Sequence, residues 1–355
     1  MEPTLRKLLL FFALMLFVPA ARAPGTEAKS PNRVDAQLAA QCEEAGVDPH
    51  ALQPLLEKPL YEFSEAEVDI YLRWLHAAEP SLRKRIVHLA RKNLGQPYDI
   101  YLLGEMPFEP YDPQPIYCLD RSDCLVYSEH TYAMALGNDW PRFMAMLQRI
   151  RYRDGQIGVA TRNHYTEADW NISNRWLAED ITAAVAGDAA QKFKQRIDRA
   201  RFLRSSFNLE VDIPVENRED VFLPYHEIDR ADAELREGDF VNIVRGHPPA
   251  EGSQAKENAI FGGSAWVGHV GLVVRGEGGS LNFIHSTKPK VREQTFASLV
   301  EYGDESRAEK LAEGKPVLLG FKFLRLRDEP MDELKKIDGE AAPRVTLPKG
   351  GQARF

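Results

Sequence analysis

Residues 269–285, HVGLVVRGEGGSLNFIH, predict a β-hairpin with a histidine at each end. Two apolar runs flank the segment 275–279, RGEGG, whose composition is typical of a hairpin turn. If the turn is centred on Glu277, His269 lies directly opposite His285. Directly opposed residues on one face of a hairpin have Cβ atoms about 4.5–5.5 Å apart. We therefore expect one imidazole to hydrogen-bond to the other and to orient it.

A cysteine upstream offers a nucleophile for such an oriented base. Cys124 lies at the start of a predicted helix, about residues 122–136, with Asp120 or Ser122 as the N-cap. The helix dipole and the unpaired N–H groups of the first turn favour a thiolate and can stabilise an oxyanion. The negative charge of Asp123 disfavours a thiolate at Cys124, unless the carboxylate points away to cap the helix or to pair with another group. A buried structural cysteine is the alternative interpretation.

The composition limits the classes of function. Charged residues make up 28% of the chain and hydrophobic residues 44%, with a net charge of −8. This acidic balance argues against a nucleic-acid-binding surface, which would be basic. The three cysteines leave two pairings open. Cys42 could pair with Cys118 and leave Cys124 free, or Cys118 could pair with Cys124 and block it.

The N-terminus predicts an export signal over residues 1–23. Arg6 and Lys7 precede the apolar run 8–18, and residues 21–23, ARA, give a cleavage site with residues 18–20 as its rival. The run is shorter than the roughly 20 apolar residues that span a membrane. We therefore expect a periplasmic or secreted protein without stable membrane insertion after cleavage. An uncleaved anchor is the alternative.

Helical patterns come first in the chain and strand patterns second, which favours an α+β fold. The expected helices are a region that contains a Ser64–Glu67 capping box, then residues 82–94, 122–136, 139–151 and 189–203. The expected strands are residues 221–223 and 239–244, the two strands of the hairpin, and residues 317–326. Residues 246–264 resemble a flap. The predicted parts are the signal 1–23, an N-terminal helical region 24–84, a main domain 85–327 and a polar tail 328–355.

Several short motifs occur in an order known from one family. Asp123-Cys124, then residues 235–241 (LREGDFV), 269–272 (HVGL) and 283–285 (FIH), resemble the NlpC/P60 cysteine peptidases of bacterial cell walls. Residues 94–98 (LGQPY) and the run from 152–155 (YRDG) through 162–165 (RNHY) to Asp169, Trp170 and Asn174 resemble its N-acetylmuramoyl-L-alanine amidase-like branch, the DUF1460 family. The resemblance covers about residues 85–326.

The resemblance implies a papain-like core, in which the helix that carries the cysteine packs on an antiparallel sheet. The N-terminal helical region would be an addition to that core. Cys124 would be the nucleophile, His269 the base and His285 its orienting partner, with no metal or cofactor. The reaction would cleave the amide between muramic acid and L-alanine in peptidoglycan fragments. A stem-peptide endopeptidase of the same fold and a non-catalytic wall-binding module remain alternatives.

Residues 161–174 suit a sugar-peptide ligand. Tyr165 and Trp170 offer flat apolar faces, and polar side chains between them offer hydrogen bonds. The predicted binding residues are Arg162, Asn163, His164, Tyr165, Asp169, Trp170 and Asn174, with Tyr225 lining the same cleft. A zinc-dependent amidase is a further alternative, in which His164, His269 and His285 join a carboxylate.

Overall fold

A computed structural model describes residues 36–100, 117–248, 257, 258 and 260–338. The predicted signal 1–23, the leader after it, residues 249–256 and 259 of the predicted flap, and residues 339–355 of the polar tail lie outside the described residues. Within the described part, no helix is both long and apolar enough to cross a membrane.

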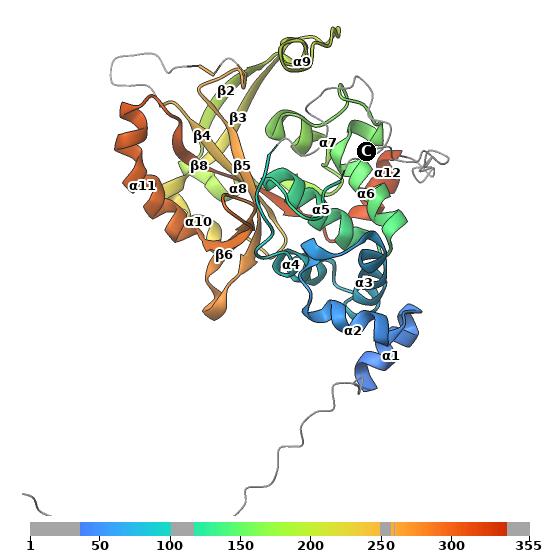
Figure 1. Cartoon of the computed structure of the whole chain (residues 1–355). Coiled ribbons are helices and arrows are strands. Elements are labelled where there is room, and N and C mark those ends of the chain that lie inside the picture. Colours follow the sequence, from blue (N-terminus) through green and yellow to red (C-terminus); the bar gives the residue numbers. More distant parts are fainter. Residues whose placement is uncertain (1–35, 101–116, 249–256, 259, 339–355) are drawn as a thin grey trace, which may run out of the picture.

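The described chain forms one antiparallel sheet with helices on both faces (Figure 1), as expected for an α+β protein. The strand order is β2-β3-β8-β4-β5-β6-β7, and β1 pairs with β8 beside this path. The strands are β1 (Ala178–Asp180), β2 (Gln191–Ile197), β3 (Glu216–Pro224), β4 (Phe240–Gly246), β5 (Ala265–Arg275), β6 (Leu281–His285), β7 (Arg292–Thr295) and β8 (Val317–Leu326).

Alternation along the strands divides the apolar side chains between two cores. On β4, Phe240 joins the core of one face while Val241 joins the core of the other. We name them the α5 face and the α11 face, each after one of the helices that cover it. The α5 face is covered by α1 (Ala36–Ala45), α2 (Pro49–Glu57), α3 (Glu65–Ala78), α4 (Leu82–Lys92), α5 (Cys124–Leu136) and α6 (Trp140–Arg151). The α11 face is covered by α8 (Thr182–Ala186), α10 (Asp229–Asp232) and α11 (Phe296–Ala312).

Helix α5 is the central helix of its face. Every residue from 126 to 135 is buried, so the helix is enclosed on all sides. The hydroxyls of its tyrosines reach backbone carbonyls: Tyr127 donates to Ala90 O at 3.0 Å and Tyr132 to Gly238 O at 2.9 Å. These bonds offset the cost of burying the hydroxyls. The N-cap is Asp123, so the predicted caps Asp120 and Ser122 are wrong by one or more residues.

The predicted helix over 189–203 is wrong in its first half. Residues 191–197 form β2, and the helix that follows is α9 (Arg199–Phe207), capped by Asp198. Phe193, Gln195 and Ile197 are buried while the basic residues between them are exposed, which is the period of a strand rather than of a helix. Strand β2 pairs with β3 over its whole length.

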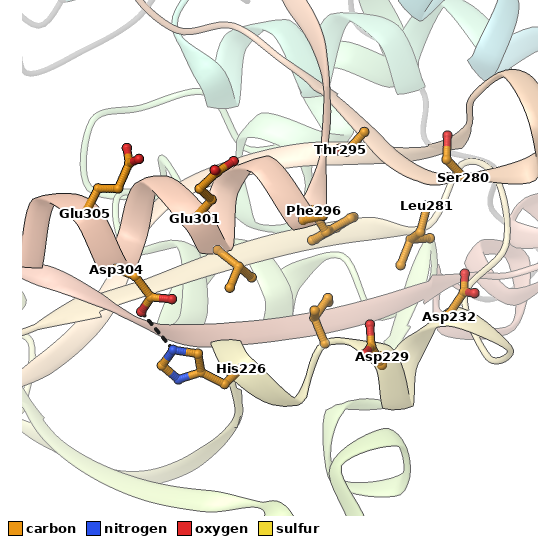
Figure 2. A pocket seen from close by; sticks show the side chains of 13 residues that line it. His226, Asp229, Asp232, Ser280, Leu281, Thr295, Phe296, Glu301, Asp304 and Glu305 are labelled. Atoms are coloured by element: carbon orange, nitrogen blue, oxygen red, sulfur yellow. Dashed lines mark hydrogen bonds and ion pairs between the residues drawn. The ribbon is translucent and has the colours of Figure 1, made fainter.

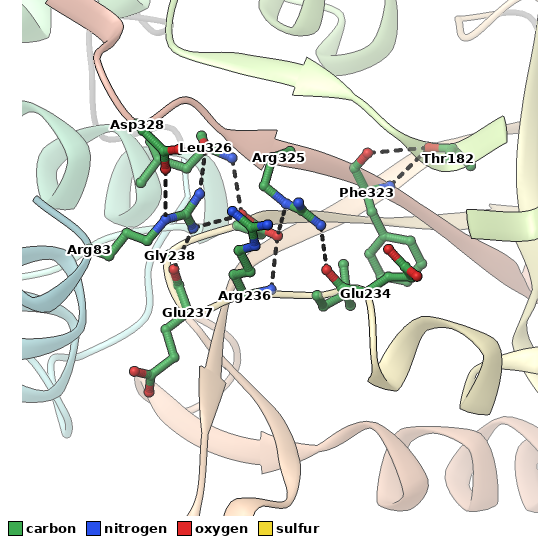
Figure 3. Close-up of polar contacts among 12 residues, drawn as sticks. Arg83, Thr182, Glu234, Arg236, Glu237, Gly238, Phe323, Arg325, Leu326 and Asp328 are labelled. Carbon is green, nitrogen blue, oxygen red and sulfur yellow. Dashed lines mark hydrogen bonds and ion pairs between the residues drawn. The ribbon is translucent and has the colours of Figure 1, made fainter. Parts of the chain in front are cut away.

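The N-terminal helices are fastened to the sheet by a buried carboxylate. Asp239, fully buried, forms ion pairs with Arg83 of α4 at 2.9 Å and with Arg325 of β8 at 2.8 Å. Figure 3 shows Arg83 and Arg325 approaching from different elements, and Arg83 also donates to Leu326 O. The predicted division between residues 84 and 85 falls inside α4.

The predicted polar tail is partly helical. Helix α12 (Pro330–Asp338) follows β8, and Leu334 is buried in the core of the α5 face. The predicted polar tail is therefore helical over α12, because Leu334 is buried and Met331 packs against the same core.

Candidate active site

Cys124 is the first residue of α5, and its sulfur is surrounded by backbone donors. Asp123 accepts hydrogen bonds from the N–H groups of Leu125 at 2.9 Å and Val126 at 2.8 Å. The N–H of Cys124 itself and that of Val270 on β5 both hydrogen-bond to the sulfur. Asp123 therefore accepts from the second and third N–H groups of the helix, and the first N–H group, that of Cys124, is directed at the thiol.

The two histidines at the ends of the hairpin form a direct hydrogen bond. His269 Nε2 and His285 Nδ1 are 2.7 Å apart, with the rings inclined at 77°. His285 is buried and His269 is partly buried. The predicted contact between the two imidazoles is therefore confirmed.

The predicted register of the hairpin is wrong by two residues. Leu272 pairs with Ile284, which sets His285 opposite Gly271 rather than opposite His269. The turn is centred on Gly278, whose φ of 71° suits a glycine, and not on Glu277. A shift of two residues keeps every side chain on its face, so the histidines are diagonal neighbours.

Gly271 makes room for this diagonal contact. A Cβ at position 271 would lie 3.0 Å from the Phe283 ring and 3.3 Å from His285 Cβ. Both distances are shorter than ordinary contacts, so a side chain there would push the His285 ring out of place.

Hydrogen bonds tie the cysteine segment to the end of the hairpin. Ser286, the residue after His285, donates to Ser122 O at 2.7 Å. Ser122 donates in turn to Gln96 Oε1 at 2.6 Å, and Val291 N–H donates to Gln96 O at 2.8 Å. Ser122, Ser286 and Gln96 are all buried. These bonds hold the start of α5 against the strand that carries His285.

Burial governs the protonation of all three groups. Burial is the largest cause that raises the pKa of the Cys124 thiol to about 12; the Asp123 charge also raises this pKa, while the two backbone N–H donors and Arg245 lower it. Burial also lowers the pKa of His269 well below its ordinary value, followed by the charge of His285 and of Arg245. The pKa of His285 is lowered to about 3, again chiefly by burial.

At neutral pH the site therefore holds a thiol and two neutral imidazoles. The helix dipole favours a thiolate at the start of α5, but desolvation acts against it and raises the pKa of Cys124. Asp123 does cap the helix, yet its charge still opposes the thiolate.

Three of the predicted binding residues lie beside the start of α5. Arg162, Asn163 and His164 line a cavity of about 120 Å³ together with Asp123 and Leu125. The His164 ring also contacts Val159 O through Nε2 at 2.7 Å.

Four other predicted binding residues hold their own segment together. They are buried: the Trp170 ring packs on Phe240 with centroids 4.5 Å apart and has no exposed face to offer a ligand. Asp169 forms an ion pair with Arg199 at 2.7 Å. Asn174 donates to Ile150 O at 2.9 Å, and Tyr165 donates to Ile260 O at 3.0 Å.

Tyr225 belongs to the opposite face of the sheet. It packs in the core of the α11 face, and its hydroxyl donates to Asp304 of α11 at 2.6 Å. The structure therefore does not bring Tyr225 to Cys124, because the sheet separates the two cores.

Two residues near Cys124 were not predicted as site residues from the sequence. Tyr98 bridges to Ser122, and the Cys124 and Asp123 charges are among the causes, after burial, that raise its pKa to about 12. Arg245 of β4 acts on Cys124 and on both histidines. The only signal for Tyr98 is its place in the LGQPY motif, and nothing in the sequence marks Arg245.

The alternative pairings and the zinc set do not form in the described chain. All three cysteines are free, and the Cys118 thiol donates to Asp120 at 3.1 Å. Among the described residues, no three or more His, Cys, Asp or Glu side chains gather where they could hold a metal ion. The set of His164, His269, His285 and a carboxylate is therefore not assembled.

The fold and the site define an α+β protein in which a helix that begins at a cysteine packs on an antiparallel sheet, with paired histidines beside it. A family model described as AmiA-like, N-acetylmuramoyl-L-alanine amidase-like, matches residues 88–307, and the chain belongs to this family. The family is amidase-like, which places the chain among hydrolase-type proteins concerned with the cell wall.

Solved structures share the fold at low sequence identity. A DUF1460 protein of Legionella pneumophila is 18% identical, with a TM-score of 0.59 over 78% of this chain and 96% of that one. An N-acetylmuramoyl-L-alanine amidase of Bacteroides uniformis is 20% identical, with a TM-score of 0.50 over 69% of this chain and 99% of that one. No curated protein matches the sequence.

Proposed function

We propose that this chain is an N-acetylmuramoyl-L-alanine amidase that acts on peptidoglycan fragments through Cys124, His269 and His285. In this proposal the core is papain-like and the chemistry is that of the NlpC/P60 cysteine peptidases. One observation carries it: His269 and His285 are hydrogen-bonded at 2.7 Å, and the residue after His269, Val270, donates its N–H to the Cys124 sulfur. Membership of the amidase-like family supports the choice of bond.

The first half of the reaction makes a thioester. The mechanism uses the tautomer in which His269 Nε2–H donates to His285 Nδ1, so that His269 Nδ1 is free to accept a proton. As the Cys124 sulfur attacks the carbonyl carbon of the muramic acid lactyl group, its proton passes to His269. The N–H of Cys124 stabilises the oxyanion. The C–N bond then breaks, and the amine of L-alanine leaves with the proton from His269.

The second half restores the enzyme. His269 takes a proton from a water molecule, whose oxygen attacks the thioester carbonyl. The C–S bond breaks, and the sulfur recovers its proton from His269. Because the resting thiol and imidazoles are neutral, His269 acts as a general base in the attack rather than as one half of a preformed ion pair.

Substrate recognition is assigned to the cavity beside α5. Arg162, Asn163 and His164 face it and would contact the sugar or the first residues of the stem peptide. The roles proposed for Tyr165, Asp169, Trp170 and Asn174 are indirect, because these buried side chains hold the segment that carries the other three.

We also propose that the protein is exported and acts in the periplasm or outside the cell. The basic start, the apolar run 8–18 and the ARA site at 21–23 support this. Cell fractionation of the full chain, with N-terminal sequencing of the mature protein, tests it. A mature N-terminus at Met1 in the cytosolic fraction would overturn it.

The test of the activity is a product analysis by mass spectrometry with defined muropeptides, including anhydro forms. The wild-type chain should release the intact peptide with a free L-alanine amine, and Cys124→Ala should release none. Cys118→Ala is the matched control and should retain turnover. A fully active Cys124→Ala variant would refute the mechanism, and inhibition by a chelator would favour a zinc-dependent amidase instead. Cleavage within the stem peptide would indicate an endopeptidase.

A non-catalytic wall-binding module is the second candidate. The raised pKa of Cys124 favours it, because a thiol that stays protonated is a weak nucleophile. This candidate predicts that the wild-type chain binds the same muropeptides and releases no product over a prolonged incubation.

A further inference from the structure

Arg245 lies on β4 beside the proposed catalytic residues. It pairs with Trp266 on β5 and with Leu318 on β8, next to register shifts in both pairings. A Cβ at Gly268 would come within 3.1 Å of Arg245 Cδ, so the arginine stem lies against Gly268. Gly268 directly precedes His269 within β5, so the stem of Arg245 lies beside the residue that leads into the histidine.

The charge of Arg245 reaches all three proposed catalytic groups. Burial is the largest cause of the raised pKa of Cys124 and of the lowered pKa of His269 and His285. Beyond burial, the Arg245 charge favours the thiolate of Cys124 and disfavours protonation of both imidazoles. Arg292, by contrast, lowers the pKa of the two histidines but is not among the causes of the pKa shift of Cys124.

Arg245 is partly buried, and among the described residues its guanidinium makes no hydrogen bond or ion pair. Three other arginines at comparable depth are paired. Arg83 and Arg325 share Asp239, and Arg199 pairs with Asp169. A partly desolvated guanidinium presents five N–H donors in a planar fork that matches a carboxylate. Arg245 therefore offers an unused anion-binding group next to Cys124.

We propose that Arg245 binds a free carboxylate of the stem peptide, close to the amide that is cleaved. The inference rests on the proposed amidase function and adds a specificity to it. The substrate class is a muropeptide whose second residue carries an ionised carboxylate. A muropeptide with a carboxamide at that position is a poorer substrate, because the carboxamide lacks the charge and one of the two acceptors of a bidentate pair.

The test uses two substrates that differ in a single group: N-acetylmuramoyl-L-alanyl-γ-D-glutamyl-L-lysine, whose second residue keeps its α-carboxylate, and its D-isoglutaminyl counterpart, in which that α-carboxylate is a carboxamide. The wild-type chain should prefer the acid in kcat/KM by about tenfold or more, as expected for a charge-assisted hydrogen bond. Arg245→Gln should bring the ratio of the two kcat/KM values close to one, mainly through KM for the acid. Arg245→Lys should keep part of the preference, because it keeps the charge without the fork.

Arg292→Gln is the matched control, since it removes a neighbouring positive charge that does not act on Cys124. This variant should keep the wild-type ratio. A wild-type ratio near one, or a ratio unchanged in Arg245→Gln, would overturn the carboxylate site while leaving the amidase intact. If the wild-type chain cleaves neither substrate or any other muropeptide, the proposed function itself fails.

Discussion

The two faces of the sheet differ in whether their polar side chains are buried or exposed. The α11 face has a cleft of about 710 Å³ between α10, α11 and the hairpin (Figure 2), with Ile228, Phe296 and Val300 among its apolar lining. Its charged groups are at the surface: the ion pair of His226 with Asp304 is half exposed. The cavities on the α5 face are smaller, up to about 390 Å³, and this face buries many polar side chains, several of which hydrogen-bond to one another.

The buried polar groups of the α5 face form defined networks. Glu129 pairs with Arg151 at 2.9 Å and accepts from Trp170 Nε1 at 3.1 Å. Glu167 accepts from Gln195 at 2.5 Å. Groups held by such networks keep a fixed geometry and a low-dielectric surrounding, which acid–base chemistry requires. If the proposed function is correct, the larger cleft is not the reactive one, and buried networks of polar side chains are the better indicator of the site.

The largest expected effect is on kcat, and it compares the replacement of one histidine on each face of the sheet. His269→Ala should lower kcat for muropeptide hydrolysis by about a thousandfold, since it removes the proposed general base. His226→Ala, which removes the histidine of the α11 cleft, should leave kcat unchanged. The measurement is the steady-state release of free L-alanine amines by the two variants and the wild-type chain.

The opposite result would place the catalytic site on the α11 face rather than on the α5 face. If His226→Ala inactivates the protein while His269→Ala does not, the chemistry belongs to the α11 cleft. A normal far-UV circular dichroism spectrum for both variants would show that the loss is not a loss of folding.

The next largest effect is on the free energy of unfolding, and it compares a buried with an exposed ion pair. Asp239→Asn should lower the free energy of unfolding by about 3–5 kcal/mol, because Arg83 and Arg325 lose their shared carboxylate and face an amide donor. Asp304→Asn on the α11 face should leave the urea midpoint nearly unchanged, because its ion pair with His226 is exposed to water and the amide oxygen can still accept the hydrogen bond from Tyr225. Urea unfolding followed by tryptophan fluorescence measures both variants. Equal losses would show that burial does not separate the two faces.

Much of the fold was predictable from local patterns. The capping box at Ser64 and Glu67 forms as predicted, and helices α4, α5 and α6 begin and end within a few residues of their predicted bounds. Strand β2 was mistaken for a helix because basic residues alternate with apolar ones over only seven positions. Helix α11, an element of seventeen residues, was not predicted at all.

The candidate site was predictable in part. Both histidines and the cysteine were chosen from spacing, and the register error was harmless because it was an even number of residues. The protonation states were not predictable, since they depend on how deeply α5 is enclosed by helices that are distant in sequence. Arg245 was missed because its role depends on Gly268 of the neighbouring strand, more than twenty positions further along the chain.

The smallest effect concerns another buried group of the α5 face, His130. Its Nδ1 contacts Val126 O at 2.6 Å, and its Nε2 accepts from Cys118 N–H at 3.3 Å, so both ring nitrogens are satisfied in the neutral form. Burial, followed by the Arg151 charge, lowers the pKa of His130 to about 3. Protonation at Nε2 would break the bond to Cys118 and bury a charge.

The free energy of unfolding depends on pH because the pKa of His130 differs between the folded and the unfolded chain. The unfolded chain binds the His130 proton near pH 6.5 while the folded chain does not, so the stabilising contribution is complete above pH 6.5 and declines toward pH 3. Between pH 6.5 and 5 the loss is about 2 kcal/mol for this residue alone. His130→Asn should therefore reduce the fall in unfolding free energy between pH 7.5 and pH 5.0 by about that amount, measured by urea titration at each pH. An unaltered fall in His130→Asn would show that the folded chain accepts this proton, and that the α5 face does not shield His130 as its contacts indicate.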